Sequence, residues 1–146
     1  MGYTTRFTRS WTITPPLSPA MKEFLTKLAN TRRMKRRLPE TIYGVEGEYF
    51  VDGVGHRGQD DDDTVLDSNT APSTQPGLWC SWVPSKDGKK LQWDGSEKFY
   101  DYIPWVQYLI QHILAPNGYV LNGTVKWKGE DRKDTGRIHI VNNVLS

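Results

Sequence analysis

The sequence contains a single cysteine among its 146 residues. One thiol excludes a disulfide within the chain and favours a reducing compartment. The sequence also has no apolar run close to the roughly 20 residues that span a membrane, and its first residues do not form the apolar stretch of a signal peptide. These absences predict a cytoplasmic protein that does not act at a membrane.

Motifs of common catalytic and cofactor sites are missing too. The three histidines and the cysteine are scattered, without the close spacing of a structural zinc site. Gly53, Gly55 and Gly58 match the dinucleotide-binding spacing, but acidic residues follow where that motif needs a helix. No serine stands in a nucleophile elbow, and Cys80 lies in an alternating apolar segment where a thiol is usually inert. The sequence therefore predicts no cofactor.

Aromatic residues, in contrast, are abundant, with six Trp, seven Tyr and four Phe. They supply core area, and they can also supply stacking surfaces. A chain of this length can bury about two-thirds of its unfolded surface in one core. Because no repeat or change in composition divides the chain, we expect one domain over residues 1–146. A long loop is expected at 52–76, which is rich in Gly, Asp, Ser, Thr and Pro.

Segment 93–114 gives the strongest secondary-structure signal. Its apolar residues recur at steps of three and four, which predicts an amphipathic helix. Asp94 and Glu97 have the spacing of a capping box, and Ser96 is a competing N-cap. Pro104 predicts a short first turn followed by a kink or a restart. An apolar stripe this wide must cover a sheet or other helices.

Strands are expected on both sides of that helix. Residues 3–13 alternate as one half-buried strand or a strand pair, and a helix should begin at Pro19 after the N-cap Ser18. Segment 78–83 is apolar on both faces, which predicts a central strand, and a hairpin joins it to the next strand. Two more strands follow the long helix.

The predicted fold class is therefore α+β. It comprises a mainly antiparallel sheet with a ββαββ C-terminal half, one long helix packed on the sheet, and an N-terminal strand–helix unit. The first helix is expected to cover the other face of the sheet.

Positive charge is concentrated in one short segment, although the net charge is only +2. The cations are Arg32, Arg33, Lys35, Arg36 and Arg37. They could contact phosphates, and a helical conformation would spread them over more than one face. Trp79, Trp93, Tyr100 and Trp127 would add stacking surfaces if they were exposed beside this segment. The alternative is structural, because cations are favoured at a helix C-terminus and aromatic side chains usually lie in the core.

Carboxylates supply a catalytic alternative. Glu97 and Asp101 are four residues apart on one face of the expected helix, and Glu130 and Asp131 lie in the last expected hairpin loop. Either group could perform acid–base catalysis if burial raised one pKa.

Four consecutive carboxylates in the expected long loop supply a weak metal-site alternative. They are Asp60, Asp61, Asp62 and Asp63. This acidic run could bind Mg²⁺ or Ca²⁺ loosely, but it lacks the glycine and the glutamate that a calcium loop needs. An ordinary acidic loop is the simpler interpretation.

Several motifs carry a resemblance to a known family. They are Thr31–Arg36, Gln75–Trp82, Trp93–Tyr102, Leu121–Gly123 and Gly129–Asp131. With these motifs the sequence resembles a family of small uncharacterised proteins from bacteriophage and bacterial genomes, and the resemblance spans nearly the whole chain. The resemblance implies no activity and no residue role. It implies a context, which is a phage- or prophage-type protein in a bacterial cytoplasm, where such proteins often bind a host component.

We therefore expect a non-catalytic accessory protein that binds a host protein, nucleic acid or nucleotide, and that could inhibit a host defence system by doing so. The expected contact is segment 32–37 with the neighbouring loop. Two alternatives stay open. One is a small metal-dependent hydrolase or nuclease that uses the carboxylates, and the other is a structural or assembly protein, for which a homo-oligomer would be the sign.

Overall fold

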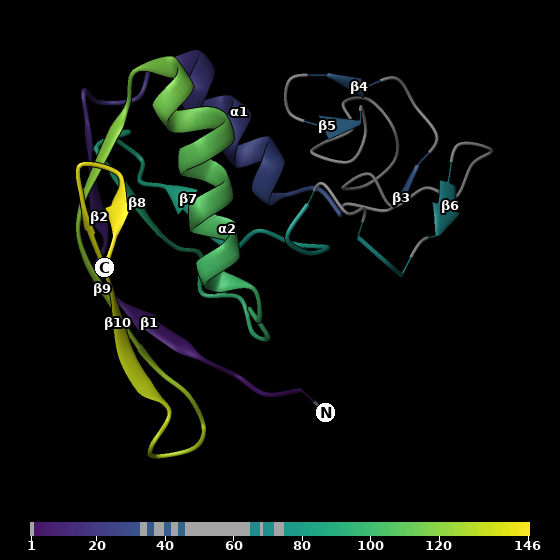
Figure 1. Ribbon diagram of the computed structural model, residues 1–146, viewed down its shortest axis with the longest axis vertical. Coiled ribbons are helices and arrows are strands. Elements are labelled where there is room, and N and C mark those ends of the chain that lie inside the picture. The colour runs from purple at the N-terminus through teal and green to yellow at the C-terminus, as the bar shows by residue number, and fades with distance from the viewer. Residues whose placement is uncertain are drawn as a thin grey trace.

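An antiparallel sheet of seven strands forms one layer of the fold, and the helices lie on one side of it (Figure 1). Its path runs β11–β10–β9–β2–β8–β7, and β1 pairs with β9 next to β2. The strands are β1 (Arg6–Thr8), β2 (Trp11–Thr14), β7 (Trp82–Pro84), β8 (Lys90–Trp93), β9 (Val120–Lys128), β10 (Thr135–Val141) and β11 (Val144–Leu145). With the helices α1 (Pro19–Ala29) and α2 (Tyr102–Tyr108), they form the α+β fold that the sequence predicts.

The computed structural model describes residues 2–32, 35–36, 40–41, 44–45, 65–67, 69–71 and 75–146. In these residues two small sheets lie beyond α1, away from the main sheet (Figure 1). They comprise β3 (Lys35–Arg36) paired with β6 (Val65–Asp67), and β4 (Glu40–Thr41) paired with β5 (Gly44–Val45). The segment 52–76, which was expected to be a loop throughout, therefore contains a strand.

The acidic run of that segment falls outside the part of the chain that the structure describes. This applies to each of its four carboxylates, which are Asp60, Asp61, Asp62 and Asp63. The weak metal-site alternative for them stays a prediction from the sequence.

Strand β9 connects the two halves of the main sheet. It pairs with β1 and β2 along one edge and with β10 along the other. Leu121 and Val125 alternate inward and are fully buried. Gly123 opposes Trp11 on β2, where a methyl group would lie 3.2 Å from the Ser10 carbonyl oxygen. A glycine is needed there because the two backbones approach too closely for a side chain.

Both helices pack on the same face of the sheet (Figure 1). Leu25 and Leu28 of α1 join one hydrophobic core with Trp105 and Leu109 of the second helical segment and with Trp11 of β2. The expectation that the first helix covers the opposite face is therefore wrong. The outward positions of the strands are Thr, Lys, Arg, Asn and Gln for the most part, so they gave α1 no apolar surface to cover.

The second helix begins later than the sequence predicts. Its first residue is Tyr102, and residues 94–101 form an irregular loop in which Lys98 has a positive φ of 62°. Asp94 bonds to the Ser96 amide within that loop, so it does not cap the helix. Pro104 lies in the first turn, where an amide hydrogen is not needed, so no separate helical turn precedes it, although the sequence predicts one.

The end of this helix follows the sequence signal. After α2 the chain continues as a π-helical segment (Leu109–Leu114) and a short 3₁₀ segment (Ala115–Asn117). Gly118 then adopts the left-handed conformation that ends many helices, with a φ of 82°. The helical apolar stripe is buried at Val106, Leu109 and Ile113.

Two further predictions need correction. Segment 78–83 was expected as a central strand, but β7 covers only Trp82–Pro84 and lies at the edge of the sheet. Within the segment Cys80 and Trp82 are buried and Leu78, Trp79 and Val83 are half-buried, with α1 and α2 both packed against β7. The first helix ends at Ala29, and the cations Lys35 and Arg36 belong to β3. A helical conformation of the cationic segment is therefore wrong for these two residues.

Candidate ligand pocket at the end of the first helix

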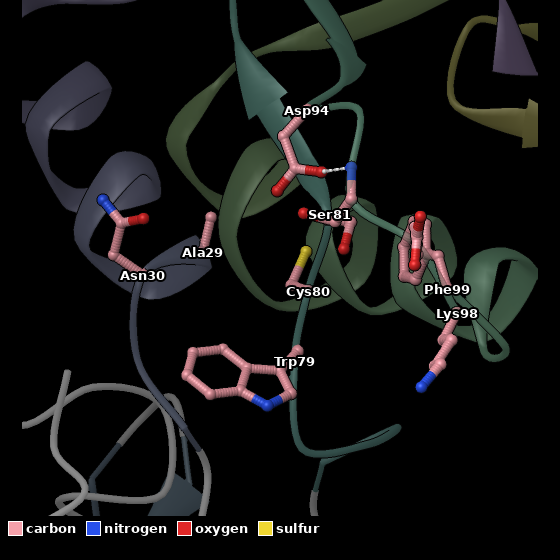
Figure 2. A pocket seen from close by; sticks show the side chains of 10 residues that line it. Ala29, Asn30, Trp79, Cys80, Ser81, Asp94, Lys98 and Phe99 are labelled. Atoms are coloured by element: carbon pink, nitrogen blue, oxygen red, sulfur yellow. Dashed lines mark hydrogen bonds between the residues drawn. The ribbon is translucent and has the colours of Figure 1, made fainter. Parts of the chain in front are cut away.

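A pocket of about 500 Å³ opens where α1 ends (Figure 2). The last turn of α1, the segment before β7 and the loop after β8 each supply part of its wall. The lining residues are Ala29, Asn30, Trp79, Cys80, Ser81, Asp94, Ser96, Glu97, Lys98 and Phe99. This volume falls in the range of sites for small ligands.

Local contacts fix each wall of the pocket. Asn30 caps α1, and its amide donates to carbonyls of the last turn. The loop after β8 is closed by Asp94, whose Oδ1 accepts from the Ser96 amide at 2.8 Å. Phe99 is buried and holds the end of this loop, with its ring 5.2 Å from that of Trp82 in an edge contact.

Trp79 and Cys80 form the wall between α1 and this loop. The indole of Trp79 is half-buried and extends below the end of α1 (Figure 2). The Cys80 side chain is buried, and its thiol lies 3.7 Å from the Trp82 carbonyl oxygen. Burial of the thiol matches the structural role expected from its apolar neighbours. Trp79 therefore offers the aromatic surface of the pocket.

A second pocket of about 350 Å³ adjoins the first, because Trp79 and Lys98 line both. Its other walls come from Ala71, the Gly77–Leu78 segment, Tyr100 and Asp101. Partial burial raises the pKa of the Asp101 carboxyl above its usual value. Trp79 and Lys98 thus border both cavities, and each cavity also has other polar groups in its wall.

Among the described side chains of the predicted cationic segment, that of Arg32 lies near these pockets. Arg32 is half-buried, two residues after Asn30, and its Nη2 donates to the Asn69 side-chain oxygen at 3.2 Å. Asn69 lies two residues before Ala71, which lines the second pocket. For Lys35 and Arg36 the structure describes the backbone, and Arg33 and Arg37 lie outside the described residues.

The other aromatic candidates make structural contacts. The Trp93 indole N–H donates to the Ser96 carbonyl oxygen at 3.2 Å, and its ring is 5.5 Å from that of Phe7. The Trp127 indole lies across Gly136 and donates to Asp134 Oδ1 at 3.1 Å. Both side chains are half-buried, and neither lines the pocket beside Trp79. Tyr100 is exposed and lines the second pocket.

The four carboxylates of the catalytic alternative are divided between different places. Glu97 lines the first pocket and Asp101 the second. Glu97 and Glu130 also line a separate pocket with Arg6 and Lys128. Asp131 bonds to the Lys133 amide within the β9–β10 turn.

A metal centre is not formed by the residues that the structure describes. Among them, no three His, Cys, Asp or Glu side chains gather closely enough to hold a metal ion. Asp60, Asp61, Asp62 and Asp63 are not among the described residues.

Sequence reasoning did not identify Asn30, Asp94 or Lys98 as pocket residues. Asp94 received a capping role because its spacing to Glu97 fits a helix start. Lys98 lines the pocket and has a left-handed backbone conformation. This conformation is uncommon for a lysine, and no local sequence pattern predicts it. Asn30 could have been identified from the sequence. It follows the last apolar residues of the predicted first helix and precedes the cationic segment, so it is expected at the surface where the two meet.

Comparisons with known proteins leave the ligand of this pocket to be inferred from its residues. Within the described part of the chain, every helix is too short or too polar to cross a bilayer. No family model, curated protein or solved structure matches the sequence.

Proposed function

We propose that the protein binds a nucleotide-type ligand in the pocket at the end of α1 and does not transform it. The observation that supports this proposal is the position of Trp79. Its half-buried indole lines a cavity of about 500 Å³ together with hydrogen-bonding side chains and a cation. Any of the nucleic-acid bases can stack on an indole, because every base has an aromatic face.

The groups around Trp79 complement the remaining parts of a nucleotide. Asp94 Oδ2 and the Asn30 side chain can bond to base edges or to sugar hydroxyls. Lys98 can neutralise a phosphate, and Arg32 lies two residues beyond the pocket wall. The pocket thus places an aromatic face, an acceptor and a cation within one small cavity.

Binding is favoured over turnover by the exposure of the pocket carboxylates. Asp94 and Glu97 are both exposed. An acid–base pair works best when burial or a like charge separates the two pKa values. In the context that the phage and bacterial resemblance implies, such a protein would sequester a nucleotide signal, or a host component that carries one, and could inhibit a defence system in the bacterial cytoplasm.

The test is calorimetric titration with the four ribonucleoside monophosphates. Trp79→Ala should weaken the binding of whichever nucleotide binds by about tenfold or more, because a stacked base contributes roughly 1–3 kcal/mol. Trp79→Phe keeps an aromatic ring and should retain most of the affinity. Lys98→Gln, which removes the cation of the pocket, should also weaken binding, and Lys22→Gln on the first turn of α1 is its charge control. No binding of any of the four nucleotides, or equal binding by Trp79→Ala, would overturn the proposal.

One observation favours a second candidate function, hydrolysis by carboxylates. Glu97 and Glu130 line the same pocket of about 390 Å³, beside Arg6 and Lys128. Two carboxylates near two cations could act on a phosphodiester or an ester. Hydrolysis of bis(p-nitrophenyl) phosphate that is lost in Glu97→Gln and Glu130→Gln would support this function, and a chelator would show whether it needs a metal. Turnover that is absent, or indifferent to both changes, would remove it.

A further inference from the structure

The face of the main sheet that points away from the helices is cationic. None of its seven strands contains Asp or Glu, although the chain has 17 acidic residues. The outward positions carry five exposed cations, which are Arg6, Lys90, Lys126, Lys128 and Arg137. We call this surface the open sheet face. In the described part of the chain, no helix covers it (Figure 1).

The strand register places like charges directly opposite each other on this face. Arg6 on β1 opposes Lys128 on β9, and Lys126 on β9 opposes Arg137 on β10. Directly opposed like charges destabilise a sheet. Among the described residues, none of the five cations forms an ion pair with a carboxylate. Arg6 and Lys128 share a pocket with Glu97 and Glu130, whereas Lys126 and Arg137 lie outside it, so a partner of opposite charge would most clearly neutralise the Lys126–Arg137 pair.

The side chains at the remaining outward positions indicate which class of partner this face can bind. Thr8, Thr12, Asn122 and Thr124 supply hydroxyl and amide groups between the cations, and such groups commonly bond to phosphate oxygens. The aromatic residues of the strands have the opposite parity and point to the core. Unpaired bases would find no stacking surface here, whereas a duplex presents its phosphates and keeps its bases stacked.

We propose that the open sheet face binds the phosphate backbone of double-stranded nucleic acid, without reading its sequence. The cations spread over β1, β8, β9 and β10, so the contact crosses several strands. Arg6 and Lys128 also border the pocket of Glu97 and Glu130. Lys126 and Arg137 lie outside that pocket. Their substitution therefore tests the contact with nucleic acid without changing the pocket.

This surface is independent of the nucleotide pocket. The pocket is built from the end of α1 and the loop before α2, on the covered side of the sheet. Trp79→Ala should therefore leave duplex binding unchanged. Either proposal can fail while the other stands.

The test is fluorescence anisotropy with a labelled 24-base-pair DNA duplex and its single strand, at 50–200 mM NaCl. Wild-type protein should bind the duplex more tightly than the single strand, with an affinity that falls steeply with salt. Lys126→Gln with Arg137→Gln should weaken duplex binding by about tenfold or more at the lowest salt. It should also make the slope of log K against log salt shallower by about 2, since each phosphate contact contributes about 0.9.

The control removes the same charge from the covered side. Lys22→Gln with Lys27→Gln lies on α1 and should leave both the affinity and the slope nearly unchanged. Circular dichroism should show that both double variants are folded. Absence of duplex binding at 50 mM NaCl, equal losses in the two double variants, or single-strand binding as tight as duplex binding would each overturn the proposal.

Discussion

At the scale of single residues, Asp101 is a carboxylate that is partly desolvated although its residue is exposed. Burial raises its pKa, and its Oδ2 lies so close to Gly77 that a methyl group there would be 2.7 Å away. As the helix N-cap residue it makes no side-chain capping bond. The ionised side chain therefore costs stability that a neutral side chain of the same shape would not cost.

The sign of the pH dependence follows from this shift. A carboxyl with a raised pKa in the folded state binds its proton more tightly there than in the unfolded chain, so its contribution to stability falls as pH rises through the folded pKa. We expect Asp101→Asn to be more stable than wild type at pH 7 and to lose this advantage in acid. Urea unfolding at pH 3, 5 and 7 measures it. A constant difference across this range would contradict the assignment, and Asp94→Asn is a matched exposed control.

At the scale of elements, the start of the second helix shows where local sequence is insufficient. The apolar spacing of Phe99 fits the helical stripe, and Phe99 is indeed buried. However, Gly95 and Lys98 adopt positive φ angles that interrupt a helix before Tyr102. A pattern of apolar residues reports which side chains are buried, and a loop can bury a side chain as well as a helix can.

The same limit explains the edge strand and the pocket. Segment 78–83 is apolar on both parities because two helices reach it from elsewhere in the chain, and local sequence does not encode that contact. The alternation of β1, β2, β9 and β10 was readable because each strand has one face in the core and one in solvent. The cations of the open sheet face were visible in the sequence. Their convergence depends on the register of strands that are far apart in the chain.

Pro104 provides a test of the helix start. In a helix interior, a proline costs about 3 kcal/mol, so its replacement by alanine would stabilise the protein strongly. In the first turn, where the structure places it, Pro104→Ala should change the free energy of unfolding by less than about 1 kcal/mol. Chemical denaturation measures the difference. A large stabilisation would mean that the helix begins earlier than Tyr102.

At the scale of the whole molecule, a net charge of +2 conceals a strong separation of charge. The strands of the main sheet hold five cations and no carboxylate, so the acidic residues are confined to other parts of the chain. An average over the chain therefore says little about binding. A net charge of +2 is low for a protein that binds nucleic acid, whereas the distribution of charge on the open sheet face favours such binding.

This separation should appear in the salt dependence of folding. Repulsion between Lys126 and Arg137 is screened by salt, so wild-type protein should gain stability as NaCl rises from 20 to 200 mM. Lys126→Thr should be more stable than wild type by roughly 0.5 kcal/mol at low salt and should gain less from added salt. Thermal unfolding at each concentration measures both effects. A salt response identical to that of wild type would show that these charges do not repel in the folded sheet.

The position of Trp79 and Lys98 in the walls of both cavities has a consequence for ligand design. Because both side chains border two cavities, two small ligands joined by a short tether could fill both sides at once. The second half would then bind at a high effective concentration, and the linked compound would gain far more affinity than its halves possess. A dinucleotide is one form of such a molecule, with one nucleotide in each cavity.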